Sequence, residues 1–366
     1  MRRIGKIFRL CLINIFILVV LLLSINLFSA TVHDSVAIYK GWFPSINKKA
    51  SRPSLENKDL AQAIYLEKQK LRTQYIPYLG WSRLPFKGKT TNVNEDGDRV
   101  TPSTTKHPVG HIRFFGGSTT WGSGVDDQNT IPAHFNALHP NYQVHNHGEA
   151  GFVSRQELAR LVNLVNQNAP MDLVVFYDGC NDAHHMCRAD LSLNGHREES
   201  KIRNKLEPRS HVLESLTRSL RTSIRWIKTK LEDKKPPSQC QADHRYAQNV
   251  AQTIVNNWTI AKKVAELGGA EFHAILQPVA PIGSPNIEYL PNRKSISRSK
   301  DYWLVYSLIQ EIIQRDGIDW IHDFTDAFDR KEYIYIDSCH VNALGNKIIA
   351  EKVHKIIGPQ LIPPNS

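Results

Sequence analysis

Strand-like and helix-like patterns alternate along residues 110–357. Leu173–Tyr177 is a continuous apolar run, and His111–Phe115 is a second strand-like segment. Apolar residues at i, i+3, i+4 and i+7 mark a helix face at Leu158, Leu161, Val162 and Val165. Further strands are predicted at Tyr142–His145, Phe272–Leu276 and Ile321–Phe324, and further helices at Ile131–Leu138, Asp243–Leu267 and residues 301–315. Asn342 is positioned to cap a final helix.

This alternation predicts the fold class. A continuous apolar strand such as Leu173–Tyr177 is expected where helices cover both faces of a parallel sheet. We therefore predict an α/β fold with a doubly wound parallel sheet. In such folds the functional site lies at the carboxyl ends of the strands.

The regions outside this alternation suggest five segments. We predict a basic stub and membrane anchor, a stalk or linker, a strand or hairpin extension, a catalytic domain and a tail, at residues 1–30, 31–74, 75–109, 110–358 and 359–366. An insert at 183–240 interrupts the alternation. Within it, residues 188–235 hold 13 Lys/Arg against 7 Asp/Glu, with apolar residues at helical spacing. This pattern fits either a solvated helix or a basic helix on an anionic membrane.

The N-terminal apolar run predicts the location of the chain. Leu10–Phe28 is uncharged for 19 residues, enough to cross a hydrocarbon core of about 30 Å. Four basic residues precede it, so we expect a cytoplasmic N-terminus and an exported domain, periplasmic in a Gram-negative bacterium. The alternative is a cleaved signal peptide, but Phe28 stands where that cleavage site needs a small residue.

Charge and cysteine content then limit the partners. The net charge is +11, and the four basic residues before the apolar run account for +4 of it. The remaining +7 suits an anionic glycan or a lipid surface. We expect no nucleic acid, since the chain shows no basic-aromatic motif. Exported cysteines form disulfides, but the pairing of Cys180, Cys187, Cys240 and Cys339 stays open. We expect Cys339 to be bridged; free thiols are the alternative in a reducing compartment.

Two segments carry candidate chemistry. Ser118 lies on a glycine-rich turn after a strand, and Asp337 precedes His340 by three residues. A serine hydroxyl needs an adjacent base, an imidazole supplies one near neutral pH, and a carboxylate orients the imidazole. A phosphate-binding loop is the alternative reading of the turn, but Ser123 stands where that loop requires lysine.

Two further segments follow neighbouring strands. Gly151 comes after the second strand, and Asn181 comes after the third. The N–H groups of Ser118 and Gly151 and the side-chain amide of Asn181 are candidate donors to an oxyanion. Ordinary loop turns are the alternative for each segment alone. Asp182 is interpreted as a structural carboxylate beneath this loop.

The four segments together resemble the blocks of the SGNH hydrolase superfamily, the GDSL-type esterases and lipases. The resemblance covers roughly residues 110–357, although Gly117 stands where the family usually has Asp. It implies a flavodoxin-like α/β/α fold and no metal or organic cofactor. It also implies Ser118, Asp337 and His340 as the catalytic residues, with Ser118, Gly151 and Asn181 forming the oxyanion hole.

Histidine-rich segments raise the question of a metal. His184 and His185 lie near Cys187, and His145 lies near His147, but neither spacing matches a strong zinc pattern. We expect no metal site. A thiol nucleophile at Cys339 is a further alternative that we weigh below the serine.

Three functions fit these patterns. The first is an exported, membrane-anchored serine esterase acting on O-acyl, above all O-acetyl, groups of a glycan or lipid. The second is a polysaccharide O-acetyltransferase with the same catalytic residues. The third is a non-catalytic anchored module that binds glycan. The oligomeric state does not follow from the sequence.

Overall fold

A computed structural model describes residues 6, 9–25, 28, 58–103, 105–206, 237–291, 293–296 and 300–361. The chain divides into two compact units. One comprises Met1–Lys49 and Glu198–Pro237. The other, called the core unit below, comprises Ala50–Arg197 and Ser238–Ser366. Every residue predicted to take part in chemistry lies in the core unit.

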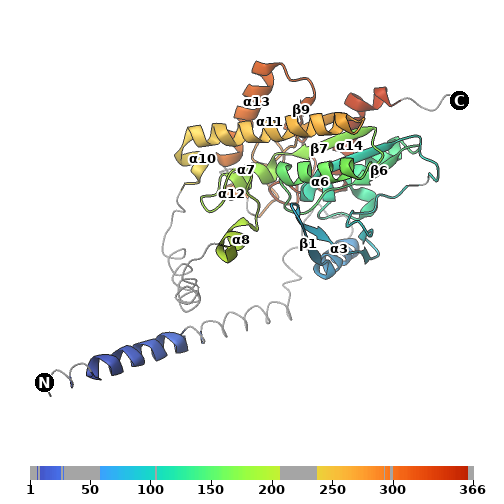
Figure 1. Ribbon diagram of the computed structural model, residues 1–366. Coiled ribbons are helices and arrows are strands. Elements are labelled where there is room, and N and C mark those ends of the chain that lie inside the picture. Colours follow the sequence, from blue (N-terminus) through green and yellow to red (C-terminus); the bar gives the residue numbers. More distant parts are fainter. Residues whose placement is uncertain are drawn as a thin grey trace. The chain divides into compact units, whose positions relative to one another are not determined.

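The core unit is built on a parallel sheet of five strands. They are β5 (His111–Gly116), β6 (Gln143–Asn146), β7 (Leu173–Asp178), β8 (Glu271–Leu276) and β9 (Ile321–Asp323). Their order across the sheet is β6-β5-β7-β8-β9, with every neighbouring pair parallel. Figure 1 labels β6, β7 and β9 of this sheet. Numbered along the chain this is 2-1-3-4-5, the flavodoxin-like order. Its switch point lies between β5 and β7.

Helices cover both faces of the sheet. One face packs against α5 (Ile131–Leu138) and α14 (Ala343–Ile357), and the other against α6 (Ser154–Asn166), α7 (Cys180–Met186), α11 (His244–Leu267) and α13 (Lys300–Asp316). Successive strand residues alternate between the two cores: Phe115 and Phe176 face α11, while Phe114 and Val175 face α14. The predicted three-layer α/β/α fold is confirmed.

Local patterns located these elements well. Each predicted strand and helix of the sheet layers is present, with its ends shifted by a few residues at most. The predicted cap is also confirmed, because the Asn342 side chain accepts the N–H of Gly345 at 3.0 Å. Short helices complete the unit at α10 (Gln239–Ala242), α12 (Arg293–Ile296), η1 (Asp127–Asn129) and η2 (Gly358–Gln360).

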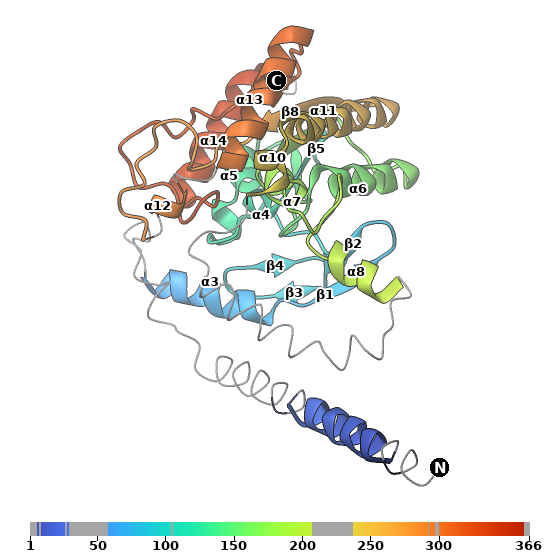
Figure 2. The same ribbon diagram turned by 90° about the vertical axis from the view of Figure 1, so that its left-hand side faces the viewer.

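The N-terminal extension forms two small antiparallel ladders. β1 (Thr73–Ile76) pairs with β2 (Gly80–Arg83), and β3 (Phe86–Lys87) pairs with β4 (Asn92–Val93) (Figure 2). The helix α3 (Lys58–Lys70) precedes them. Its Glu67 carboxylate accepts the N–H groups of Lys89 at 2.6 Å and Thr91 at 3.0 Å. Residues 58–70, assigned to the linker from sequence, therefore belong to the folded extension.

The insert is closed by a cross-link at its ends. Cys187 and Cys240 form a disulfide, whereas Cys180 and Cys339 are free and buried. The expectation that Cys339 is bridged is therefore wrong. The reason is position: Cys187 and Cys240 lie at the two ends of the insert, with Cα atoms 5.1 Å apart, a normal separation for a disulfide.

Some sequence predictions concern the other unit or lie outside the described residues. Residues 9–25 are helical, and α8 (Glu199–Leu206) lies near the start of Glu198–Pro237; both belong to the unit other than the core unit. Over the residues that the structure describes, no helix combines the length and apolar character needed to cross a membrane. Residues 31–57 of the predicted stalk and the amphipathic stretch at 213–231 lie outside the described residues.

Candidate active site

A sharp strand-to-helix turn places Ser118 at the carboxyl edge of the sheet. β5 ends at Gly116, and the short helix α4 (Ser118–Trp121) begins two residues later. Gly116 has φ +155°, and a Cβ there would lie 2.1 Å from the Thr120 hydroxyl oxygen. A Cβ on Gly117 would lie 2.3 Å from the Asn181 amide nitrogen. Only glycines allow the chain to turn this tightly against its neighbours.

A buried arginine holds the far end of this turn. The Arg99 guanidinium donates to the carbonyls of Trp121 at 2.8 Å, Gly122 at 2.7 Å and Val125 at 2.9 Å. It also donates to the Asp127 carboxylate at 2.8 Å. These contacts satisfy carbonyls that a helix end leaves without an intrahelical donor. Sequence reasoning missed Arg99, because it lies in a polar turn with no motif around it.

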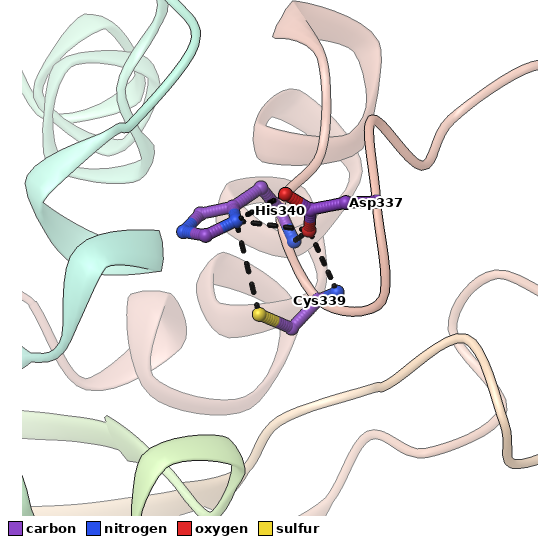
Figure 3. A group of neighbouring side chains, drawn as sticks. All are labelled: Asp337, Cys339 and His340. Atoms are coloured by element: carbon purple, nitrogen blue, oxygen red, sulfur yellow. Dashed lines mark hydrogen bonds and ion pairs between the residues drawn. The ribbon is translucent and has the colours of Figure 1, made fainter. Parts of the chain in front are cut away.

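Three of the predicted residues form one hydrogen-bonded chain. The His340 Nε2 atom lies 2.7 Å from the Ser118 hydroxyl oxygen, across 222 residues of sequence. The His340 Nδ1 atom lies 2.9 Å from each Asp337 carboxylate oxygen (Figure 3). The side chains of His340 and Asp337 are 24% and 37% exposed, so a solute can reach them.

The surroundings of Asp337 keep it ionised. Burial alone would raise the pKa of Asp337. The hydrogen bond and charge of His340, with the backbone N–H groups of His340 and Cys339, outweigh burial and hold that pKa well below its usual range. An ionised carboxylate only accepts hydrogen bonds, so the proton of a neutral His340 lies on Nδ1. Nε2 then presents its lone pair to Ser118.

The predicted oxyanion residues lie beside the nucleophile turn. Asn181 is in the first turn of α7, and its amide donates one N–H to the Phe152 carbonyl at 2.7 Å. The same nitrogen lies over Gly117, and an amide carries a second N–H. Gly151 has φ +83° and directly precedes Phe152. The Glu149 N–H donates to the Gly116 carbonyl at 3.0 Å, which ties this loop to the turn.

Three buried carboxyl groups lie behind the Asn181 loop. Asp182 accepts the N–H and the hydroxyl of Ser154, and Asp178 accepts the Trp258 indole N–H at 3.2 Å. Burial raises the pKa of Asp178 to about 6. Burial, with the charge of Asp178, raises the pKa of Asp182 to about 7 and that of Glu157 well above its usual value. Asp182 therefore holds α6 against α7 and does not contact Ser118.

The histidine pairs have other partners. The sulfur of Cys187 is bonded to Cys240, so it offers no thiolate to His184 or His185. His147 pairs with the Asp98 carboxylate and the Arg113 guanidinium, each at 2.8 Å. Among the described residues, potential metal ligands cluster at Asp337, Cys339 and His340. The hydrogen bond with Cys180, followed by burial, raises the pKa of the Cys339 thiol well above its usual value, which disfavours the thiolate. This set therefore fits a proton relay better than a metal.

A cavity of about 360 Å³ lies elsewhere in the core unit. It is bordered by Phe272, Trp320 and His322, at the amino-terminal ends of β8 and β9. The predicted site lies at the opposite edge of the sheet, at the carboxyl ends of the strands. None of the predicted site residues lines this cavity.

No family model and no curated protein matches the chain. Solved structures do match it, and three of them are described here. A lipolytic G-D-S-L protein from Veillonella parvula is 13% identical, with a TM-score of 0.38 over 68% of this chain and 98% of its own. A carbohydrate acetylesterase family member from Sinorhizobium meliloti is 15% identical, with a TM-score of 0.34 over 68% and 100%. An aryl esterase from M. smegmatis is 12% identical, with a TM-score of 0.39 over 68% and 100%.

Likenesses at this level assign neither reaction nor substrate. The chain's own sequence and structure give three features for comparison. The segments that hold Ser118, Gly151, Asn181 and His340 follow one another in this order, the strand order of the sheet is 2-1-3-4-5, and Ser118 lies within hydrogen-bonding distance of His340 at the sheet edge. In these features the chain resembles the SGNH hydrolase superfamily, the GDSL-type esterases and lipases.

Proposed function

We propose that this chain is a serine esterase that hydrolyses O-acyl esters. The observation that carries the proposal is the hydrogen-bonded chain from the Ser118 hydroxyl through His340 to Asp337, with distances of 2.7 Å and 2.9 Å. A half-buried serine in contact with an imidazole lone pair, with the imidazole oriented by an ionised carboxylate, is the arrangement that activates a hydroxyl for acyl transfer.

The proposed reaction has two halves. The Ser118 oxygen attacks the ester carbonyl while its proton passes to His340 Nε2, and Asp337 stabilises the imidazolium. The tetrahedral adduct then collapses, and His340 gives the proton to the leaving alcohol. A water molecule, deprotonated by His340, attacks the acyl-enzyme in the same way. The acid leaves, and Ser118 recovers its proton.

The negative charge on the tetrahedral adduct needs donors. The first N–H groups of a helix have no intrahelical acceptor, so the Ser118 N–H is available at the start of α4. The Gly151 N–H and the second N–H of the Asn181 amide complete the proposed oxyanion hole. Each such donor is worth about 3–4 kcal/mol in the transition state.

We further propose an O-acetyl ester of a glycan or lipid as substrate. The support is the net charge of +7 that remains after the four basic residues before the apolar run are set aside, which favours an anionic substrate or surface. Release of free acetate from an acetylated glycan would support hydrolysis. Appearance of a newly acetylated sugar in place of acetate would show instead that the chain is an O-acetyltransferase.

The extracytoplasmic, membrane-anchored location is also a proposal. It depends on the sequence alone, on the uncharged run Leu10–Phe28 behind four basic residues. Alkaline phosphatase folds only in an oxidising compartment. Fused to the C-terminus of the full chain it should be active; an inactive phosphatase together with an active cytoplasmic reporter would contradict the location.

The central experiment measures hydrolysis of 4-nitrophenyl acetate by the purified full chain. We expect Ser118→Ala and His340→Gln to abolish it. Ser123→Ala is the matched control, because Ser123 lies on the same turn without contacting His340, and it should retain activity. Equal rates for Ser118→Ala and the parent chain would overturn the proposal, and glycan binding without hydrolysis would favour a non-catalytic module.

A further inference from the structure

A buried glutamine ties the helix that carries the nucleophile to the end of β8. Gln277 directly follows β8 and is 2% exposed, and Thr119, the residue after Ser118, is 6% exposed. The Thr119 hydroxyl donates to the Gln277 Oε1 atom at 3.2 Å, across 158 residues of sequence. Arg99 holds the far end of α4, so Gln277 holds the end of this short helix that carries Ser118.

The segment that begins at Gln277 also contacts the other two loops of the site. The Gln277 N–H donates to the Asp178 carbonyl at 2.8 Å, where β7 leads into α7 and the proposed oxyanion donor. The Ala280 N–H donates to the Ser338 carbonyl at 2.9 Å, within the histidine loop of Figure 3. One short segment therefore joins the parts of the chain that carry the nucleophile, the oxyanion donor and the base.

The side-chain amide of Gln277 is only partly satisfied. Its Nε2 atom is buried and has no hydrogen-bond partner among the residues that the structure describes. An unpaired buried amide destabilises a fold, and an apolar side chain of similar size would avoid that penalty. Packing alone therefore does not explain a glutamine at this position, whereas the hydrogen bond with Thr119 does.

We propose that Gln277 is a positioning residue for the nucleophile. Through Thr119 it fixes the start of α4, and with it the distance between the Ser118 hydroxyl and His340 Nε2. This inference rests on the proposed esterase function. Ser118 and His340 are 222 residues apart, so their 2.7 Å contact depends on the framework between them, and a misplacement of about 1 Å can lower a rate by about 10². Gln277 is buried, so it acts through Thr119 and does not touch the substrate.

The kinetic test uses a matched pair of substitutions at Thr119, with 4-nitrophenyl acetate and the full chain. Thr119→Val keeps the shape of the side chain and removes the hydroxyl, whereas Thr119→Ser keeps the hydroxyl and removes the methyl group. We expect Thr119→Val to lower kcat by about tenfold or more with KM little changed, because a small misplacement of Ser118 affects the reaction and not the binding. Thr119→Ser should retain most of kcat, and Gln277→Met should resemble Thr119→Val.

Melting temperatures separate positioning from simple stabilisation. Thr119→Val/Gln277→Met replaces both partners by apolar groups of similar size, which is nearly neutral or stabilising in a buried pair. We expect a melting temperature equal to or above that of the parent chain. The value of kcat should be little lower than in either single variant, because one contact is lost in all three. A contact that only stabilises the fold would instead lower kcat and the melting temperature together.

Thr325→Val is the matched control. Thr325 is also a buried threonine that hydrogen bonds to a glutamine, accepting an N–H of Gln310 at 3.4 Å. It follows β9, and β7 and β8 lie between β9 and β5, so this variant should keep the parent kcat. Two outcomes would overturn the proposal: an unchanged kcat in Thr119→Val, or a loss in Thr119→Ser as large as in Thr119→Val.

A measurement without substrate separates this inference from the esterase proposal. The full chain is labelled with ¹⁵N-histidine, and the Nε2 signal of His340 is assigned by its absence in His340→Gln. Ser118→Ala gives the position of that signal without the serine hydroxyl. In Thr119→Val the signal should move from the parent position toward the Ser118→Ala position, even if no ester is hydrolysed. A signal that stays at the parent position contradicts the positioning role, whatever the hydrolytic activity.

Discussion

Gly117 and Asn181 approach so closely that a Cβ on residue 117 would lie 2.3 Å from the Asn181 amide nitrogen. The SGNH segment that this turn resembles usually has Asp at that position. In this chain the missing side chain leaves space that the Asn181 amide occupies, directly before Ser118. Glycine in place of Asp at position 117 is therefore what allows the Asn181 amide to take this position.

We expect Gly117→Ala to reduce kcat by displacing Asn181. Loss of one oxyanion donor costs roughly 10²–10³ in kcat. Asn181→Ala should cause a loss of similar size, measured as hydrolysis of 4-nitrophenyl acetate. If the two changes act through the same amide, the double variant should be little worse than either single variant. Fully multiplicative losses would show that Gly117 acts by another route.

Asp337→Asn should lower kcat by about 10⁴, because an amide can orient the imidazole with the wrong tautomer. The ionised Asp337 is what keeps the proton on Nδ1 and the lone pair on Nε2. Steady-state kinetics of the full chain measure the effect, with circular dichroism to confirm that the fold is retained. A loss of less than about tenfold would remove Asp337 from the mechanism.

Arg99→Met should destabilise the core unit, because it leaves the buried Asp127 carboxylate without its cationic partner. Removing one member of a buried pair costs about 3–5 kcal/mol. Thermal unfolding checks this, and hydrolysis should fall as well, since Arg99 holds the end of α4. Arg315→Gln, at an exposed pair, should change the unfolding free energy by less than about 0.5 kcal/mol. Equal melting temperatures for both variants would contradict the role of Arg99.

The buried carboxyl groups should make stability fall as pH rises. Asp178 and Asp182 have an ordinary pKa of 3.8 and folded values of about 6 and about 7, so the folded chain holds more protons in between. Their contribution is complete below pH 3.8 and is lost as pH rises through the folded values. Four buried or half-buried histidines whose pKa values are lowered, His139, His145, His185 and His322, add the opposite slope below their ordinary pKa of 6.5. The melting temperature should therefore fall between about pH 6.5 and 8.

Asp182→Asn tests the origin of that slope. An amide imitates the protonated carboxyl and still offers an oxygen to Ser154, so the variant should show a flatter dependence on pH. Asp98, whose pKa is lowered to about 2, changes the stability with pH only in more acidic solution, so it does not affect the melting temperature in the pH range of this test. An unchanged slope in Asp182→Asn would show that other groups cause it.

Thiol counting tests the cysteine assignment. A thiol reagent should react with three cysteines of the denatured, unreduced chain, Cys11, Cys180 and Cys339. It should react with all five cysteines after reduction. Peptide mapping should join Cys187 to Cys240. A peptide joining Cys180 to Cys339 would contradict the assignment.

Sequence alone located the parts of this molecule that depend on local pattern. Leu173–Tyr177 could be assigned to a buried strand because every residue in it is apolar, and the Asn342 cap because capping involves only its own helix. The chemistry of the residue types suggested the pairing of Ser118 with His340, and the resemblance to the SGNH blocks added to it. Local pattern could not have done so, since the two residues are 222 positions apart.

The contacts that sequence did not reveal are those between distant segments. Arg99 reaches α4 only because the extension folds against β6, and Glu67 reaches Lys89 only because α3 packs beside the ladders. The expected bridge at Cys339 failed for the same reason. Which thiols meet depends on the tertiary fold, and no local pattern separates Cys339 from Cys240.

The most direct test of the account is covalent labelling of the full chain with a fluorophosphonate, followed by mass spectrometry of its peptides. We predict one adduct per chain, on the Ser118 oxygen, formed far more slowly in His340→Gln. An adduct on another residue, or labelling of Ser118 at the same rate without the imidazole, would contradict it.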